Sequence, residues 1–170
     1  MGEDLPNWII PILNWMESTW INDFALGPQW TWPIMETLHF TGMCLLFGPL
    51  LIMDLRVLGF DRLTLPQGAV HKLIPLTILG FVINLLTGIV FVFGNPYRYA
   101  MNISFAIKMV LILLAGINAI YFWMKAMPIL EHEGEHADAP MSVKVVGLSS
   151  LLLWTGVLAC GRLIPYLGTG

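Results

Sequence analysis

The sequence predicts an all-α membrane protein: a bundle of four transmembrane helices, with an amphipathic helix at the N-terminus that lies in the membrane interface. Of the 170 residues, 57% are hydrophobic and only 11% are charged, whereas soluble domains carry about 25% charged residues. The apolar residues also form four runs, each close to the roughly 20 residues that a helix needs to cross a bilayer. Nearly the whole chain goes into these runs, so we expect one membrane domain over residues 1–170.

Residues 5–24 predict the interfacial amphipathic helix. Large apolar residues recur there at helical spacing, namely Trp8, Ile12, Trp15 and Trp20. Tryptophan is enriched at the headgroup level of membranes. The pattern fits a helix that only caps the bundle and equally a docking surface for a partner, and Gly27-Pro28 ends it before the first span.

The four spans are predicted over about 33–58, 73–93, 105–124 and 145–164. Gly48-Pro49 is expected to kink the first span. Cations gather at one side of the predicted spans, at Arg56, Arg62, Lys72, Lys125 and Lys144, whereas Arg98 and Arg162 lie at the other side. The richer side should face the cytoplasm. We therefore expect a multi-pass protein of the bacterial inner membrane with both termini in the periplasm.

Composition also limits the possible partners. A pI near 5.7 provides no basic face for nucleic acid. The lipid bilayer is the partner that composition predicts. Cys44 and Cys160 both fall in apolar runs, so we expect two buried free thiols and no disulfide.

His39 is the main candidate functional residue. It lies about five residues below the outer end of the first span, or roughly 8 Å deep at 1.5 Å per residue. An ionisable side chain at membrane depth costs roughly 2.5 kcal/mol or more unless it is paired or used. Lys108 lies roughly 5 Å below the outer end of the third span by the same rise, so the two can share a site. We hypothesise that His39 ligates the iron of a b-type haem.

Other residues are expected to complete this site. Gly42 lies one turn from His39, and Gly80, Asn84 and Gly88 form a stripe on the second span with Thr87 beside it. Such a stripe allows tight helix packing, its commoner use, or the close approach of a flat macrocycle.

Charged residues extend the candidate site. Glu36 shares a face with His39, where a carboxylate can orient or assist a ligating imidazole. Lys108, Arg98 and Arg162 are candidate contacts for haem propionates, although Lys108 also fits a plain interfacial lysine. A carboxylate-bridged di-iron site is excluded because no other span contains a carboxylate.

Three other metal hypotheses follow from the sequence. Met35, His39 and Met43 recur at i, i+4 and i+8, and thioether and imidazole ligands suit Cu(I), although Met at helical spacing usually fills a core. His71 lies some 20 Å lower than His39, so it would belong to a second centre near the cytoplasmic face. The stretch His132–His136 matches the zinc motif H-E-x-x-H, but we expect a solvated acidic loop there, with weak binding of a divalent metal at most.

Several segments resemble an uncharacterised family of small four-helix bacterial inner-membrane proteins, a domain of unknown function. They are Trp15–Trp20, Trp32–Gly42, Asp54–Gly59, Pro75–Gly80, Leu86–Gly88 and Phe105–Met109. The likeness runs from Trp15 to Tyr121 and leaves out the fourth span. The layout is more loosely similar to haem-b membrane protoporphyrinogen oxidases and to copper-resistance D proteins. That looser similarity implies His39 as a cofactor ligand and Lys108 as its companion.

The functional expectation is a b-type cytochrome-like subunit that carries electrons between the quinone pool and a periplasmic electron carrier. Such a chain would be an electron-transfer subunit of an oxidoreductase complex, together with other subunits. The alternatives are a copper-handling membrane protein that uses Met35, His39 and Met43, and a non-catalytic scaffold subunit in which His39 only hydrogen-bonds between helices.

Overall fold

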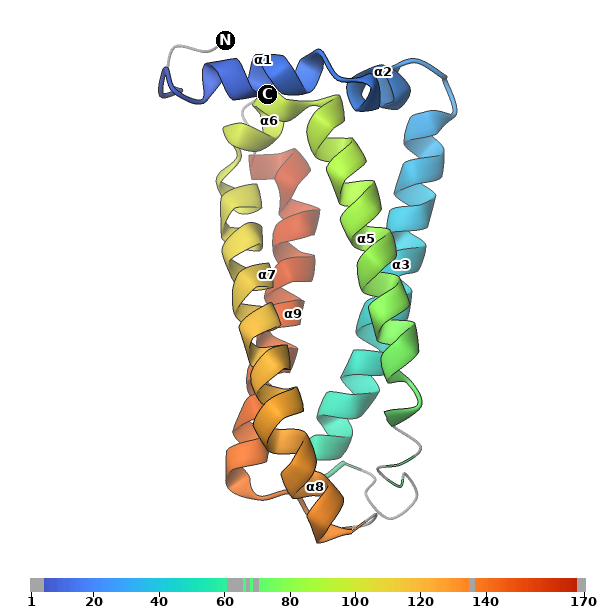
Figure 1. The fold of residues 1–170 in the computed structure, drawn as a ribbon, viewed down its shortest axis with the longest axis vertical. Coiled ribbons are helices and arrows are strands. Elements are labelled where there is room, and N and C mark those ends of the chain that lie inside the picture. Colours follow the sequence, from blue (N-terminus) through green and yellow to red (C-terminus); the bar gives the residue numbers. More distant parts are fainter. Residues whose placement is uncertain (1–4, 61–65, 67, 69–70, 135–136, 168–170) are drawn as a thin grey trace.

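The computed structural model describes residues 5–60, 66, 68, 71–134 and 137–167, and the regular elements in these ranges are all helices. The helices are arranged as a long bundle (Figure 1). In chain order they are α1 (Ile10–Glu17), α2 (Trp20–Leu26), α3 (Thr31–Val57), α5 (Ile74–Gly94), α6 (Pro96–Ala100), α7 (Ile103–Tyr121), the π-helical turn η1 (Phe122–Ala126), α8 (Met127–Glu133) and α9 (Met141–Leu167).

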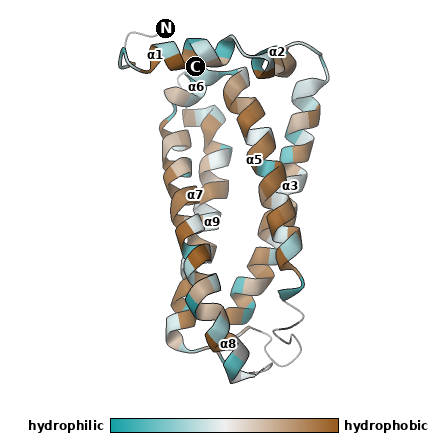
Figure 2. Cartoon of the chain, in the orientation of Figure 1, coloured by the Kyte–Doolittle hydropathy of each residue, from teal (hydrophilic) through white to brown (hydrophobic). Residues whose placement is uncertain are grey.

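Four helical segments are long and apolar enough to cross a membrane. They are Thr31–Val57, Ile74–Gly94, Ile103–Leu130 and Met141–Leu167. Hydrophobic residues dominate the middle of these helices, and hydrophilic ones gather toward the ends of the bundle (Figure 2). The all-α, four-span prediction is thus confirmed, and the protein is a multi-pass membrane protein in contact with lipid.

The last two spans are longer than predicted. The third helix continues through η1 into α8, where 124 was the expected end, and α9 begins at Met141, where 145 was the expected start. Polar residues end each apolar run in the sequence, but the helical backbone hydrogen bonds continue past them. The helices are therefore longer than the apolar runs that predicted them. The first span runs as one helix through Pro49.

The N-terminal segment forms two short helices in place of the single predicted helix over 5–24. The break falls at Ser18 and Thr19, whose hydroxyls donate to the backbone carbonyls of Trp15 and Met16, each at 2.7 Å. Such local side-chain bonds compete with helix continuation. Together α1 and α2 lie across one end of the bundle, which we call the capped end (Figure 1). The opposite end, which carries α8, is the α8 end.

The spanning helices form two pairs, α3 with α5 and α7 with α9, and α3 also packs against α9. The first pair is in very close contact. A Cβ added to Gly80 would lie 2.3 Å from the backbone nitrogen of Leu46 and 2.6 Å from the carbonyl oxygen of Gly42. A cluster of Leu46, Ala115, Trp154 and Val157 joins the two pairs. Part of the small-residue stripe therefore serves helix packing.

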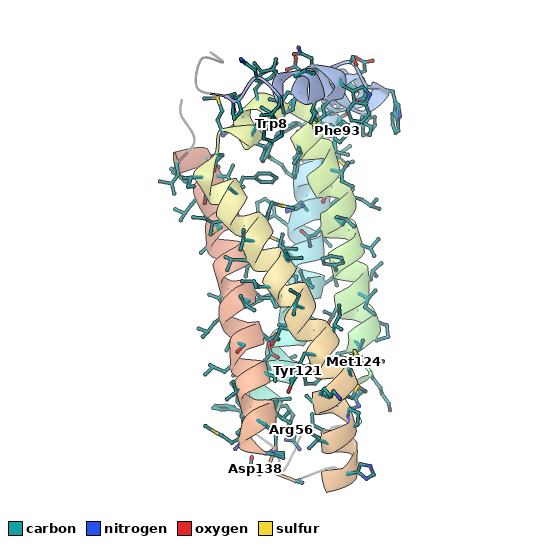
Figure 3. The ribbon with its side chains drawn as sticks, turned by 60° about the vertical axis from the view of Figure 1, so that its left-hand side comes forward. Trp8, Arg56, Phe93, Tyr121, Met124 and Asp138 are labelled. Carbon is teal, nitrogen blue, oxygen red and sulfur yellow. The ribbon has the colours of Figure 1, made fainter. Side chains whose placement is uncertain are left out.

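Charged residues gather at the α8 end, where Arg56 and Asp138 lie (Figure 3). The Arg56 side chain, expected at the membrane surface, is only 1% exposed, and its Nη2 donates to the carbonyl oxygen of Ala137 at 3.4 Å. Asp54 is buried as well, and Lys144 pairs with Asp138 at 2.8 Å. The Arg56 bond joins the segment before α9 to the end of α3, and the Lys144–Asp138 pair joins the same segment to α9.

The two cysteines are free, as predicted. The expectation that both are buried is wrong for Cys44, which is exposed on α3, while Cys160 is half-buried. A lipid-facing position is as apolar as a core, so an apolar run in the sequence does not distinguish the two.

Candidate functional site

A cavity of about 470 Å³ lies between the helix pairs in the half of the bundle next to the capped end. We call it the polar chamber because three cationic residues, a carboxylate and a histidine line it. They are Glu36 and His39 from α3, Arg98 from α6, Lys108 from α7 and Arg162 from α9. The tertiary structure thus brings together residues from four helices that are separated by up to 126 positions in the sequence.

Thr87 on α5 holds the His39 imidazole. The Nδ1 atom of His39 lies 2.7 Å from the Thr87 hydroxyl oxygen, and this hydroxyl lies 2.7 Å from the carbonyl oxygen of Ile83 one turn earlier. A hydroxyl has one proton and two acceptor lone pairs. When it donates to Ile83, it accepts the Nδ1–H of His39. The lone pair of His39 then resides on Nε2, which is the tautomer that a metal ligand requires.

Aromatic rings surround the imidazole. Phe91 contacts the edge of the His39 ring with centroids 5.3 Å apart, and Trp32 packs on Phe91 at 5.1 Å. The Trp32 indole nitrogen donates to Glu36 at 3.0 Å. Glu36 therefore bonds the indole, and the hydroxyl of Thr87 fills the orienting role that was predicted for the carboxylate.

The cations of the chamber are available to an anionic ligand. Within the described ranges, no carboxylate oxygen lies within 4.0 Å of a side-chain nitrogen of Lys108, Arg98 or Arg162. Arg162 contacts Tyr166, whose hydroxyl lies 3.1 Å from Nη2. Lys108 reaches toward α9, where its Nζ would lie 3.4 Å from a Cβ added to Gly161.

Tyr99 in α6 also lines the polar chamber, and the sequence pattern did not single it out. Burial raises the pKa of its phenol above the usual value, Arg98 opposes that shift, and Glu36 adds to it. Its ring packs on Phe105 with centroids 5.1 Å apart. Tyr99 is therefore a neutral hydroxyl in the wall of the polar chamber.

A second cavity of about 260 Å³ continues from the first toward the middle of the bundle. We call it the apolar chamber. His39, Met43, Gly88 and Lys108 line both chambers. The other walls of the apolar chamber are almost wholly hydrophobic, including Leu46, Phe81, Leu85, Ile89, Met109 and Trp154. The two chambers thus form one amphipathic space with His39 at the junction.

The predicted glycines divide between two roles. Gly88 lines both chambers, and the nearest atom to a Cβ added there is the Cε1 of His39, at 4.0 Å. Gly42 does not follow the expectation, because it faces α5. A Cβ there would lie 2.8 Å from Asn84 Nδ2 and 2.9 Å from Ile83 Cγ2. Gly42 therefore permits helix contact, while Gly88 leaves space beside His39.

The proposed copper ligands are only partly assembled. Met43 lines both chambers with His39, but Met35 lines neither. Across the described part of the chain, no group of three or more His, Cys, Asp or Glu side chains is placed to hold a metal ion.

The other histidines lie apart from the chambers. His71 precedes α5 at the α8 end and lines neither chamber. The expected loop around His132–His136 begins later than predicted, because His132 lies in the last turn of α8. His136 lies outside the described residues.

Two polar residues, Asn102 and Ser104, hold α7 against α9 beside the site. Asn102 caps α7 by accepting from Phe105 N at 3.0 Å, and its amide donates to the carbonyl oxygen of Ile164 at 2.9 Å. Ser104 donates to the carbonyl oxygen of Cys160, also at 2.9 Å. The Asn-x-Ser pattern before an apolar run indicates an N-cap, but it does not reveal contacts 56 and 62 positions away.

Comparison with known proteins identifies a family for this chain. The sequence model of a family of unknown function (DUF6644) matches residues 15–167. The match confirms the resemblance to an uncharacterised family and extends it beyond Tyr121 through the fourth span. No curated protein and no solved structure matches the chain.

Proposed function

We propose that this protein, which belongs to the family of unknown function DUF6644, is a b-type cytochrome-like membrane subunit whose haem is ligated by His39. It would carry electrons between the quinone pool and a periplasmic electron carrier. One observation carries the proposal: the Thr87 hydroxyl lies 2.7 Å from Nδ1 of a membrane-embedded histidine at the wall of a large cavity. When this hydroxyl donates to the carbonyl oxygen of Ile83, it leaves Nε2 of His39 with its lone pair.

The shape and polarity of the polar chamber fit a haem. Its apolar lining residues, Phe40, Phe91 and Leu158, suit the hydrocarbon edge of a macrocycle, and Gly88 leaves room for a flat group beside the imidazole. Its volume of about 470 Å³ falls within the range of small-molecule and cofactor sites. A bound haem would supply reversible one-electron chemistry at its iron.

The charges of the polar chamber support the same ligand. Three cations and one carboxylate line it, and charge-assisted hydrogen bonds to carboxylates are about twice as strong as neutral ones. Arg98 and Arg162 would hold the two propionates, and Lys108 would remain at the junction with the apolar chamber. Glu36 would keep its bond to Trp32, so it would not compete for those cations.

The proposed orientation places the capped end in the periplasm of a bacterial inner membrane. Arg56, Lys72, Lys125 and Lys144 belong to the α8 end, whereas Arg98 and Arg162 lie near the capped end. Positive residues favour the cytoplasmic side. Both termini would then be periplasmic, and the polar chamber would open close to a periplasmic electron carrier or a partner subunit.

The test is an absorption spectrum of the purified protein with haem extraction. We expect a Soret band in the wild type and in His132→Ala, whose histidine is exposed in α8 and lines neither chamber. In His39→Ala we expect the band and the extractable haem to be lost. A wild-type protein without a Soret band and without extractable haem would refute the proposal.

The same samples distinguish the alternatives. Copper without iron in metal analysis would favour copper handling by His39 and Met43. A metal-free wild type whose assembly with other subunits is unchanged in His39→Ala would favour a scaffold subunit.

A further inference from the structure

We propose that the apolar chamber admits a prenylated quinone from the bilayer, through an opening between α5 and α7. The inference deepens the proposed function and rests on it, because an electron carrier buried in the membrane needs a redox partner that dissolves there. It adds a route and a docking place for that partner.

The opening is defined by residues that line the chamber and also reach the outer surface. On α5 these are Phe81 and Leu85, with 38% and 51% of their surface exposed, and on α7 Met109, with 49%. The α5 and α7 helices are joined through α6 and make no extensive direct contact in the described ranges. We therefore place the opening of the apolar chamber to the lipid-facing surface between these two helices.

The route from the aqueous side is covered at this edge. Asn22 of α2 donates to the carbonyl oxygen of Phe93 at 2.7 Å, and the ring of Trp15 packs on that of Phe93 with centroids 6.0 Å apart. The Tyr97 hydroxyl of α6 donates to Asn14 at 2.6 Å. These contacts hold the N-terminal helices over the end of α5. Trp8 and Phe93 lie near each other at this end of the bundle (Figure 3).

The chemistry of the opening selects a neutral amphiphile. Its walls are hydrocarbon, with no carboxylate among the residues that line the apolar chamber. A phosphate headgroup would lose its hydration along that path without a partner, which is costly for a charged group. A quinone ring carries only carbonyl oxygens and crosses at much smaller cost.

The polar groups at the inner end suit a carbonyl acceptor. His39, Asn84 and Lys108 are the polar residues of the chamber. Asn84 already donates to the carbonyl oxygen of Gly80 at 2.9 Å, and His39 bonds to Thr87. Lys108 is the remaining donor at the junction, so its ammonium group would bind a quinone carbonyl while the prenyl tail follows the apolar walls into the lipid.

The experiment is photolabelling by an azidoquinone with a decyl tail, with full-length protein in phosphatidylcholine nanodiscs. We expect labelled peptides from residues 81–89 and 109–112, and competition by excess decylubiquinone. Leu85→Trp fills the opening, so labelling should fall roughly tenfold, as for the loss of about 1.4 kcal/mol of binding. The matched control is Leu86→Trp, because Leu86 is 59% exposed on the same helix and lines neither chamber.

Met109→Trp narrows the opening from α7 and keeps the test decisive if Leu85→Trp does not fold. Uniform labelling of all lipid-facing helices, or labelling unchanged in both filling variants, would overturn the inference. So would displacement of the probe by phosphatidylglycerol but not by decylubiquinone. Haem content is measured on the same samples. A wild type without haem rejects the proposed function. A wild type that contains haem but shows no specific labelling rejects only the quinone route.

Discussion

Replacing Gly80 by alanine tests the close approach of α3 and α5 on which the site depends. The added Cβ would lie 2.3 Å from Leu46 N, 2.6 Å from the carbonyl oxygen of Gly42 and 2.7 Å from the carbonyl carbon of Leu45. All three atoms belong to the α3 backbone, so no side-chain rotation can relieve the overlap. The two helices must separate, and α3 carries His39 while α5 carries Thr87.

The expected magnitude combines two opposing effects. Overpacking in a well-packed interior costs about 1–3 kcal/mol, and contact with rigid backbone puts Gly80 at the upper end of that range. Alanine is favoured over glycine within a helix by about 1 kcal/mol. We therefore expect a net loss of about 2 kcal/mol in the free energy of unfolding. At about 2–4 °C per kcal/mol for a chain of this size, the melting temperature should fall by roughly 4–8 °C.

The assay is thermal unfolding in detergent, followed by circular dichroism. Gly116→Ala is the matched control, because no atom lies within 4 Å of a Cβ added at that position of α7. The control gains helix preference without a clash, so its melting temperature should stay equal or rise. If Gly80→Ala unfolds at the wild-type temperature or above it, the close contact between α3 and α5 is refuted.

Three further predictions concern the site and its support. Thr87→Val removes the oxygen that bonds the His39 imidazole, so the haem affinity measured by titration should fall roughly 10- to 100-fold. The affinity of Thr87→Ser, which keeps the hydroxyl, should stay near that of the wild type. Equal haem affinities in Thr87→Val and the wild type would contradict the argument that Thr87 sets the His39 tautomer. Asn102→Ala removes the N-cap of α7 and the side-chain amide that donates to the Ile164 carbonyl oxygen. The free energy of unfolding in detergent should therefore fall by about 2 kcal/mol or more. A free energy of unfolding equal to that of the wild type would argue against the Asn102–Ile164 bond between α7 and α9. Burial raises the pKa of Tyr99 above its usual value of 10, so the contribution of Tyr99 to the free energy of unfolding should be fully present below pH 10 and decline as the pH rises through the folded-state pKa. Absorbance at 295 nm, compared between the wild type and Tyr99→Phe, should show that the Tyr99 phenol titrates above pH 10. Titration of this phenol at pH 10 or below would contradict the prediction.

Much of the candidate site could be anticipated from depth along the predicted helices. Positions counted from the outer ends of the first and third spans put His39 and Lys108 at similar depth, and both line the polar chamber. The same counting separated His71, which lines neither chamber. Depth along a helix follows from a fixed rise per residue, so it can be read from sequence without knowing which helices are neighbours.

The direction in which a residue faces could not be read in this way. Gly42 and Gly88 both looked suited to a cofactor, yet Gly42 contacts α5 and Gly88 lines the cavity. Arg56 looked like an interfacial cation and is buried against Ala137. Such outcomes depend on the rotation of each helix about its axis, which packing against its neighbours decides.

The sequence by itself determined that the chain forms four apolar helices in a membrane, because the run lengths and the deficit of charge leave few alternatives. It also determined which ionisable groups lie at membrane depth. Only the tertiary structure decided that Thr87 contacts the His39 imidazole, that cations from three helices face one cavity, and that α5 and α7 make no extensive direct contact in the described ranges. These features arise between helices distant in sequence, where side-chain packing sets the contacts and hydropathy carries no information about them.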